Sequence, residues 1–251
     1  MILQDSLPFD LTTSRPLPNI SPLPMESWLH IDEAYAAQMA ERDRLLLGHR
    51  DDVLALDDAA RPAAEELLDL LLTWLPDSFL RSEGSVTRPD GVSVPIDRDD
   101  PLLTAGRLVQ DDLCLLEKRG TDEHVLTGAA LCFPAGWKLS LKVMRPLTAI
   151  HVPIPEYDDG LAKRVQRLFD GVQPGRPLMR FNRLWYDDPT LFQPGPRLHN
   201  SHRADPRSAR FFRTERQVIL KLPLRGAAVF SIHTYVLPRE RALQLSAVET
   251  A

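Results

Sequence analysis

The chain has 251 residues, of which 43% are hydrophobic and 26% are charged, and its formal net charge is −5. This composition is typical of a globular protein and excludes a largely disordered chain. No apolar run approaches the roughly 18 residues that a membrane-spanning helix requires, and the first residues lack the basic start of a secretory signal. We therefore expect a cytoplasmic protein with no membrane partner.

Charge is unevenly distributed along the chain. Residues 1–100 contain 20 acidic and 8 basic side chains, whereas residues 197–225 contain 2 acidic and 8 basic ones. An acidic protein with one basic segment is unlike a nucleic-acid-binding protein, whose affinity depends on neutralising phosphates, so we expect no nucleic-acid partner. The basic segment is either a solvated strand face or an arginine clamp for carboxylate or phosphate groups.

The sequence lacks the motifs of several common enzyme classes. It has neither a Gly-x-Gly-x-x-Gly fingerprint nor a phosphate-binding loop, so a nucleotide enzyme of standard type is not expected. Cys114 and Cys132 are the only cysteines, too few for a four-cysteine zinc or iron–sulfur site. Each lies in an apolar run, which is typical of a small buried side chain.

The first hundred residues predict an arm followed by helices. Residues 1–25 contain five prolines and no periodic pattern, so we expect them to form an arm over the surface. Apolar positions interleaved with charges predict a helix over 32–47, and an apolar stripe behind Pro62 predicts another over 61–74. Residues 84–101 are rich in proline, glycine and aspartate, which indicates a long loop.

The rest of the chain predicts a sheet interrupted by helices. Two strands joined by a turn form a hairpin, three strands end the chain, and the middle is helical and irregular. The expected elements are strands 111–117 and 125–133, a short helix 137–143, an extended segment to residue 155, a helix 159–172, and strands 178–186, 211–220 and 227–236.

This order predicts an α+β fold, with a five-stranded antiparallel sheet and helices on one face. It is also the order of strands in PAS domains, which hold haem, flavin or small acids between the sheet and the middle helices. We expect one PAS-like domain over residues 26–251, with an N-terminal helical extension (26–107) and a sheet core (108–238). Such a fold carries little functional information alone.

One of the seven histidines stands apart from the others. His151 lies among apolar residues and is followed by Pro153 and Pro155, which fix the backbone and remove hydrogen-bond donors. A stiff, dry segment of this kind suits an axial haem ligand or a general base. The alternative is a core histidine bonded to a carbonyl. His233 alternates along a strand, which is more typical of a packed residue than of a ligand.

Three segments together resemble a known family. They are residues 131–137 (Leu-Cys-Phe-Pro-Ala-Gly-Trp), residues 145–155 around His151, and residues 213–217 followed by 230–235. Their order and spacing resemble the haem-dependent oxidative N-demethylase alpha-subunit-like family, and the resemblance extends over about residues 16–238.

The resemblance implies a PAS-like domain that binds haem b and uses dioxygen to convert a small secondary amine into a primary amine and formaldehyde. It implies that His151 is the metal ligand. The further roles that it implies are walls of the haem or substrate space at Phe133 and Trp137, propionate contacts at Arg145 and Arg216, and catalytic groups at Tyr235 and Glu215.

The electrons for such a reaction have to come from elsewhere. Because the chain has no nucleotide fingerprint and only two cysteines, we expect a separate reductase subunit that carries flavin and an iron–sulfur cluster and uses NADPH. The sequence departs from the family at Ala135 and Gly136, and at His233, where we would expect arginine. Two alternatives are a non-catalytic PAS-type module that binds or senses haem or another small ligand, and an interaction subunit that docks an acidic partner through residues 197–225.

Overall fold

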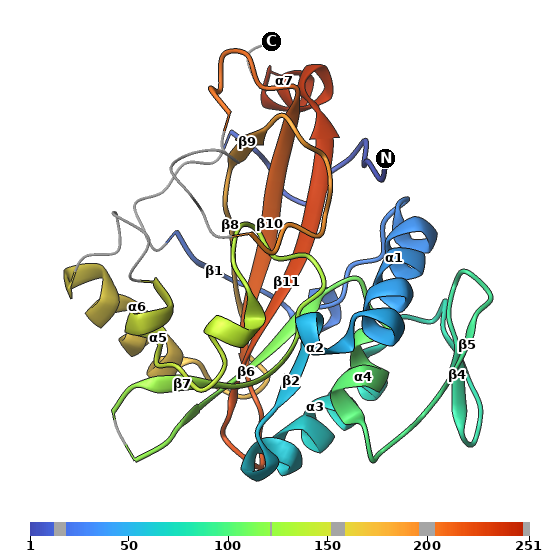
Figure 1. The fold of residues 1–251 in the computed structure, drawn as a ribbon, viewed down its shortest axis with the longest axis vertical. Coiled ribbons are helices and arrows are strands. Elements are labelled where there is room, and N and C mark those ends of the chain that lie inside the picture. Colours follow the sequence, from blue (N-terminus) through green and yellow to red (C-terminus); the bar gives the residue numbers. More distant parts are fainter. Residues whose placement is uncertain (13–18, 121, 152–158, 196–203, 248–251) are drawn as a thin grey trace.

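The computed structural model describes residues 1–12, 19–120, 122–151, 159–195 and 204–247, but not the side chains of His151, Asp159, Leu161 and Ala162. Its centre is a mostly antiparallel sheet of eight strands, dominated by the long hairpin of β10 and β11 (Figure 1). The strands of this sheet are β1 (Ser21–Pro22), β2 (Leu54–Leu56), β6 (Asp112–Lys118), β7 (His124–Ala130), β8 (Leu178–Phe181), β9 (Leu184–Tyr186), β10 (Phe211–Lys221) and β11 (Ala228–Pro238). The order across the sheet is β1-β8-β10-β11-β6-β7-β2, with β9 also paired to β10.

Helices and a second, small sheet surround these strands. The helices are α1 (Tyr35–Gly48), α2 (Arg50–Val53), α3 (Arg61–Trp74), α4 (Pro101–Gly106), α5 (Leu147–His151), α6 (Asp159–Gly171) and α7 (Arg239–Ala247). The small sheet consists of β3 (Leu80–Arg81), β4 (Ser85–Thr87) and β5 (Ser93–Pro95), and the 3₁₀ turns are η1 (Met25–Ser27), η2 (Asp58–Ala60) and η3 (Leu139–Leu141).

The large sheet has hydrophobic cores on both faces. Successive strand residues point to opposite sides, so Leu115 packs with α1, α3 and α4, whereas Cys114 packs with α5 and α6. On β10, Val218 belongs to the first core and Ile219 to the second. Figure 1 shows the two groups of helices on either side of the strands. The expectation of helices on one face is therefore wrong.

The α+β class is confirmed, but the expected count of five strands is wrong. The predicted strand over 178–186 is divided into β8 and β9, and both pair with β10. The short strands β1 and β2 extend the sheet, and two or three residues are too few to show an alternating pattern in the sequence. The likeness to a PAS domain stays a prediction.

Two segments differ from the sequence-based expectation in their local structure. Residues 84–101 contain the β4–β5 hairpin, in which Val86 and Val94 are buried and Gly91 turns the chain at a φ of +84°. Residues 147–151 are helical rather than extended. Pro146 precedes this helix, where a missing N–H costs no hydrogen bond, and its carbonyl accepts from Ile150 N–H at 3.0 Å.

The first residues of the chain contribute to the core. The side chain of Gln4 is fully buried, and its backbone N–H donates to the carbonyl of Val236 at 2.9 Å. The N–H of Val236 donates in return to Oε1 of Gln4 at 2.8 Å. Leu11 is also buried, beside Phe181 and Tyr235. Within the described part of the chain, no helix has both the length and the apolar character needed to span a membrane.

Candidate functional site

Polar side chains gather on the face of the sheet against which α5 and α6 pack. They come from β8, β10 and β11 and from the residue that follows β8. We call this set the polar floor, and its members are Arg180, Asn182, Glu215, Gln217 and Thr234. Arg180 lies opposite Gln217, and Glu215 lies opposite Thr234. Directly opposed residues of antiparallel strands share one face, so the register brings these side chains together.

Glu215 is the fixed anion of the polar floor. Its Oε2 accepts hydrogen bonds from Nδ2 of Asn182 at 2.8 Å and from Nε2 of Gln217 at 2.9 Å. Asn182 is itself held in place, because its Oδ1 accepts from the backbone N–H of Glu215 at 2.8 Å. Both side-chain donors are neutral and both bind the same oxygen. The negative charge of Glu215 is therefore positioned but not neutralised.

Two atoms of the polar floor lack the partners that buried polar groups normally have. Nε of Arg180 and Oγ1 of Thr234 are buried and make no hydrogen bond. Burial lowers the pKa of Arg180, although the charge of Glu215 opposes this change. Buried polar atoms in folded proteins are almost always hydrogen-bonded, so these two atoms leave polar positions on this face open to a ligand.

Apolar side chains continue the same face towards α5 and α6. Ile232 lies opposite Gln217, and Phe230 lies opposite Ile219 in the next hydrogen-bonded row. Phe230 and the half-buried Trp137 both pack against the core beneath these helices. The face thus combines a polar end with an apolar end, which is the arrangement expected for a ligand with both kinds of surface.

The segment from Phe133 to Trp137 is anchored at Phe133 by buried charges. Oδ1 and Oδ2 of Asp112 accept from the backbone N–H groups of Cys132 at 2.7 Å and Phe133 at 2.9 Å. The fully buried Arg42 binds Asp112 at 2.7 Å. From the other side, Arg213 donates to the carbonyl of Phe133 at 2.8 Å. Arg42, Arg213 and the carboxylate of Asp112 therefore fix the position of Phe133.

A second polar group, the histidine cluster, lies on the opposite face and consists of Asp32, Asp111 and His233. Nε2 of His233 donates to Oδ2 of Asp32 at 3.1 Å, and its Nδ1 lies 3.6 Å from Oδ2 of Asp111. Oδ1 of Asp111 accepts from Ser231 at 2.6 Å. The ring of Tyr235 stacks on His233, with the ring centres 4.4 Å apart.

The histidine cluster is arranged as one cation between two anions. Burial would lower the pKa of His233, but the carboxylates of Asp111 and Asp32 outweigh it and raise the pKa above the ordinary value. Burial would raise the pKa of Asp32, but its hydrogen bonds, chiefly with His233, lower it to about 2. All three side chains are 1% exposed or less. This arrangement suits a structural tie better than contact with a substrate.

The residues predicted for the site are divided between the two faces. Glu215 belongs to the polar floor, whereas Arg216, next to it on β10, points to the other face and donates to the carbonyls of Ser27 and Trp28. Tyr235 is buried beside His233, and its hydroxyl has no partner. Phe133 and Trp137 are placed as described above.

Two further predicted residues lie on the segment that leads into α6. Arg145 is exposed, and its backbone carbonyl accepts from Leu126 N–H at 3.1 Å. His151 is the last residue of α5, and its side chain lies outside the described part of the structure. The site roles of all seven residues stay predictions.

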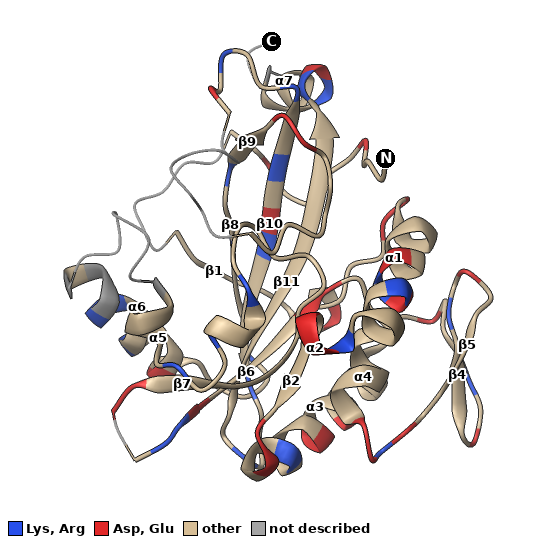
Figure 2. Ribbon diagram, viewed as in Figure 1, with Lys and Arg blue, Asp and Glu red and all other residues tan. Residues whose placement is uncertain are grey.

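The two central strands, β10 and β11, differ in their charged residues. Figure 2 shows acidic and basic positions along β10 and none along the neighbouring β11. Sequence reasoning missed Arg180, Asp111 and Asp112. A signal was present for Asp111 and Asp112, because a charged residue at or inside an otherwise apolar strand is rarely buried without a partner.

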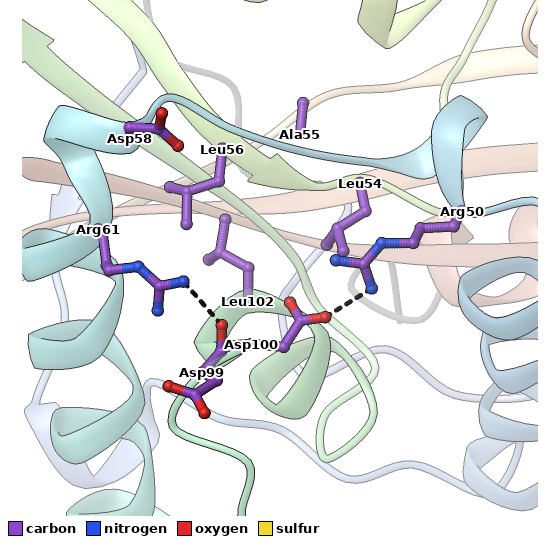
Figure 3. A pocket seen from close by; sticks show the side chains of 9 residues that line it. All are labelled: Arg50, Leu54, Ala55, Leu56, Asp58, Arg61, Asp99, Asp100 and Leu102. Atoms are coloured by element: carbon purple, nitrogen blue, oxygen red, sulfur yellow. Dashed lines mark hydrogen bonds and ion pairs between the residues drawn. The ribbon is translucent and has the colours of Figure 1, made fainter.

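A separate pocket of about 200 Å³ opens beside β2, between the first turns of α3 and α4 (Figure 3). Its arginines are already occupied, because Arg50 pairs with Asp100 at 2.6 Å and Arg61 donates to the carbonyl of Asp99 at 3.0 Å. None of the residues predicted for the site lines this pocket. We assign no function to it.

The fold, the half-buried polar floor and the buried histidine cluster define an α+β protein whose central sheet carries ionisable side chains on both faces. A family model described as "Haem-dependent oxidative N-demethylase, alpha subunit-like" matches residues 19–248. This match covers most of the chain, and the protein belongs to that family. The resemblance inferred from the sequence is thereby confirmed. Among the described residues there is no group of three or more histidine, cysteine, aspartate or glutamate side chains that could hold a free metal ion.

Proposed function

We propose that the protein is the haem-binding component of an oxidase that demethylates small secondary amines, and that the substrate binds over the polar floor. The observation that carries this proposal is the polar floor itself, with two unpartnered buried atoms beside an apolar surface. The family supports haem dependence, and its description names an alpha subunit. The haem type, the amine and the reductase partner are part of the proposal.

The residues of this face fit a haem. A porphyrin needs apolar contacts for its ring, a cation or hydrogen-bond donor for its propionates, and at least one axial ligand. Phe230, Ile232 and Trp137 offer the apolar contacts, and Arg180 offers a guanidinium whose Nε has no partner. His151 is the proposed axial ligand, since it is the last residue of α5, whose Leu147 and Ile150 pack in the same apolar core as Phe230 and Trp137.

Each remaining role follows from the chemistry of a side chain. A secondary amine is protonated near neutral pH, so the open oxygen of Glu215 can bind its N–H groups and orient the methyl group. The segment of Phe133 and Trp137, anchored at Phe133, would exclude water from that space. Haem b, when bound, supplies the centre at which dioxygen is activated. Electrons would come from a separate reductase subunit with flavin and an iron–sulfur cluster.

The test has two stages. The purified protein is first titrated with hemin, and a Soret band at one equivalent is the expected result. The loaded protein is then given an electron donor, dioxygen and dimethylamine, and formaldehyde is measured. Absence of hemin binding would contradict the proposal. Hemin binding without formaldehyde from any small amine would instead support the non-catalytic binding or sensing module.

A further inference from the structure

Arg180 stands apart from the other buried or half-buried arginines that the structure describes. Four of these have their guanidinium groups bonded to oxygen atoms: Arg42 to Asp112, Arg88 to Asp43 and Asp90, Arg213 to the carbonyl of Phe133, and Arg216 to the carbonyls of Ser27 and Trp28. For Arg180, in contrast, the described residues offer no hydrogen bond or ion pair, and its Nε atom is buried. Arg180 is only half-buried, but a buried donor without an acceptor is costly, so a side chain in this state is expected to serve a ligand.

The nearest anion does not neutralise Arg180. The charge of Glu215 acts on its pKa, but no hydrogen bond between the two side chains contributes. Arg180 is opposite Gln217, so Glu215 is its diagonal neighbour, and such neighbours lie about 7–8 Å apart. Glu215 is bound instead to the two amides of Asn182 and Gln217. The amides hold the carboxylate apart from the guanidinium, which leaves each charge available to a third group.

We propose that Arg180 binds a carboxylate of the ligand that occupies the polar floor, an inference that rests on the proposed function. A guanidinium fork matches a carboxylate bidentately. A doubly charged phosphate is disfavoured because Glu215 adds a fixed negative charge to the same face. The hydroxyl of Thr234, also unpartnered, is a further donor on this face.

Two molecules could supply this carboxylate. One is the haem, through a propionate. The other is the substrate, if the amine is an N-methylated amino acid, whose ammonium would bind Glu215 while its carboxylate binds Arg180. Both sources require the same guanidinium, and two ligand pairs separate them. Hemin is compared with hemin dimethyl ester, and N-methylglycine is compared with dimethylamine.

The experiment uses the full chain and the variants Arg180→Gln, Arg180→Lys and Arg176→Gln. Arg176 is exposed and precedes β8, so its substitution is a control with the same change of charge. We expect Arg180→Gln to weaken binding of the carboxylate-bearing ligand about 10- to 100-fold, and Arg180→Lys to weaken it less. Arg180→Gln should not lower the melting temperature of the ligand-free protein, because it removes an unpaired, half-buried charge.

The outcomes assign the source of the carboxylate. If Arg180→Gln loses the preference for hemin over its dimethyl ester, the partner is a propionate. If it binds hemin normally but loses the preference for N-methylglycine, read from the Soret band, the partner is the substrate. Behaviour equal to that of Arg176→Gln in both comparisons overturns the inference.

Failure of the proposed function gives a different result from failure of the inference about Arg180. If the wild-type protein binds no hemin at all, the haem proposal fails. In that case N-methylglycine should still raise the melting temperature of the ligand-free protein, and Arg180→Gln should abolish this rise. Such a result would support the inference about Arg180 although the haem proposal has failed. Absence of that rise would overturn it.

Discussion

His233 on β11 donates a hydrogen bond to Asp32, which precedes it by 201 residues, at 3.1 Å and with almost no solvent contact for either side chain. Replacing His233 with glutamine removes the cation between two buried carboxylates. We expect the free energy of unfolding to fall by about 3–5 kcal/mol in urea denaturation, because a buried charge without its partner is strongly destabilising. The exposed His49 is the control, and His49→Gln should change stability by less than about 0.5 kcal/mol. A loss as small as that in His233→Gln would contradict the ion-pair interpretation.

The contribution of the histidine cluster should depend on pH in a defined direction. The folded pKa of His233 is raised above 6.5, so its contribution is complete below pH 6.5 and is lost as the pH rises through the folded value. The folded pKa of Asp32 is lowered from 3.8 to about 2, so its contribution is complete above pH 3.8 and is lost as the pH falls towards 2. The stability difference between wild type and His233→Gln should therefore be larger at about pH 5 than at about pH 9. If the stability difference between wild type and His233→Gln instead grows with pH, His233 is not the cation of the histidine cluster.

Asp112 is expected to be the most sensitive carboxylate near the candidate site. Asp112→Ala leaves Arg42 buried without its counter-charge and frees the backbone N–H groups of Cys132 and Phe133. We expect a loss of about 3–5 kcal/mol in the free energy of unfolding. The exposed Asp52 provides a control, since Asp52→Ala should be nearly neutral. Equal stability of the two variants would show that the buried pair contributes nothing.

Glu215 is predicted to act on the amine and not on the haem. Glu215→Gln keeps the shape of the side chain and removes its charge. We expect the KM for a protonated amine to rise about 10- to 100-fold while the dissociation constant of hemin stays unchanged. Glu240→Gln on the exposed start of α7 is the matched control. A loss of hemin affinity with an unchanged KM would move Glu215 from substrate binding to haem binding.

The proposed axial role of His151 can be tested by spectroscopy. His151→Ala should shift or abolish the Soret band of the reconstituted protein, and added imidazole should restore it in part, because imidazole can occupy the vacated position. His49→Ala serves as the control, since His49 is half-exposed. An unchanged spectrum in His151→Ala would assign the iron ligand to another residue.

The sequence predicted the secondary structure well where periodicity was strong. The helix α3 was predicted with its observed bounds, Arg61–Trp74, because its apolar stripe and Pro62 mark both the face and the start. The hairpin β4–β5 was missed, because strands of three residues in a segment rich in proline, glycine and aspartate show no visible alternation. The second helical face was missed because no single strand reveals which helix packs on which side.

The candidate site was predicted only in part, for a related reason. Glu215 and Arg216 are neighbours in sequence, yet strand alternation sends them to opposite faces of the sheet. Arg180 lies in no recognisable sequence motif. It stands out only when the hydrogen-bond partners of the buried and half-buried arginines are compared. Long-range pairing between β8 and β10 creates the polar floor, and a local pattern cannot encode it.

The distance in sequence between His233 and Asp32 also bears on how the chain matures during translation. Strand β11 lies in the middle of the sheet, between β10 and β6, yet it leaves the ribosome after all the other described strands of this sheet. Until it emerges, Asp32 and Asp111 have no cation, β6 has an open edge, and Gln4 lacks both of its backbone partners at Val236. Contacts of such long range form late and slowly. The nascent chain should therefore depend on protection from aggregation until β11 has emerged.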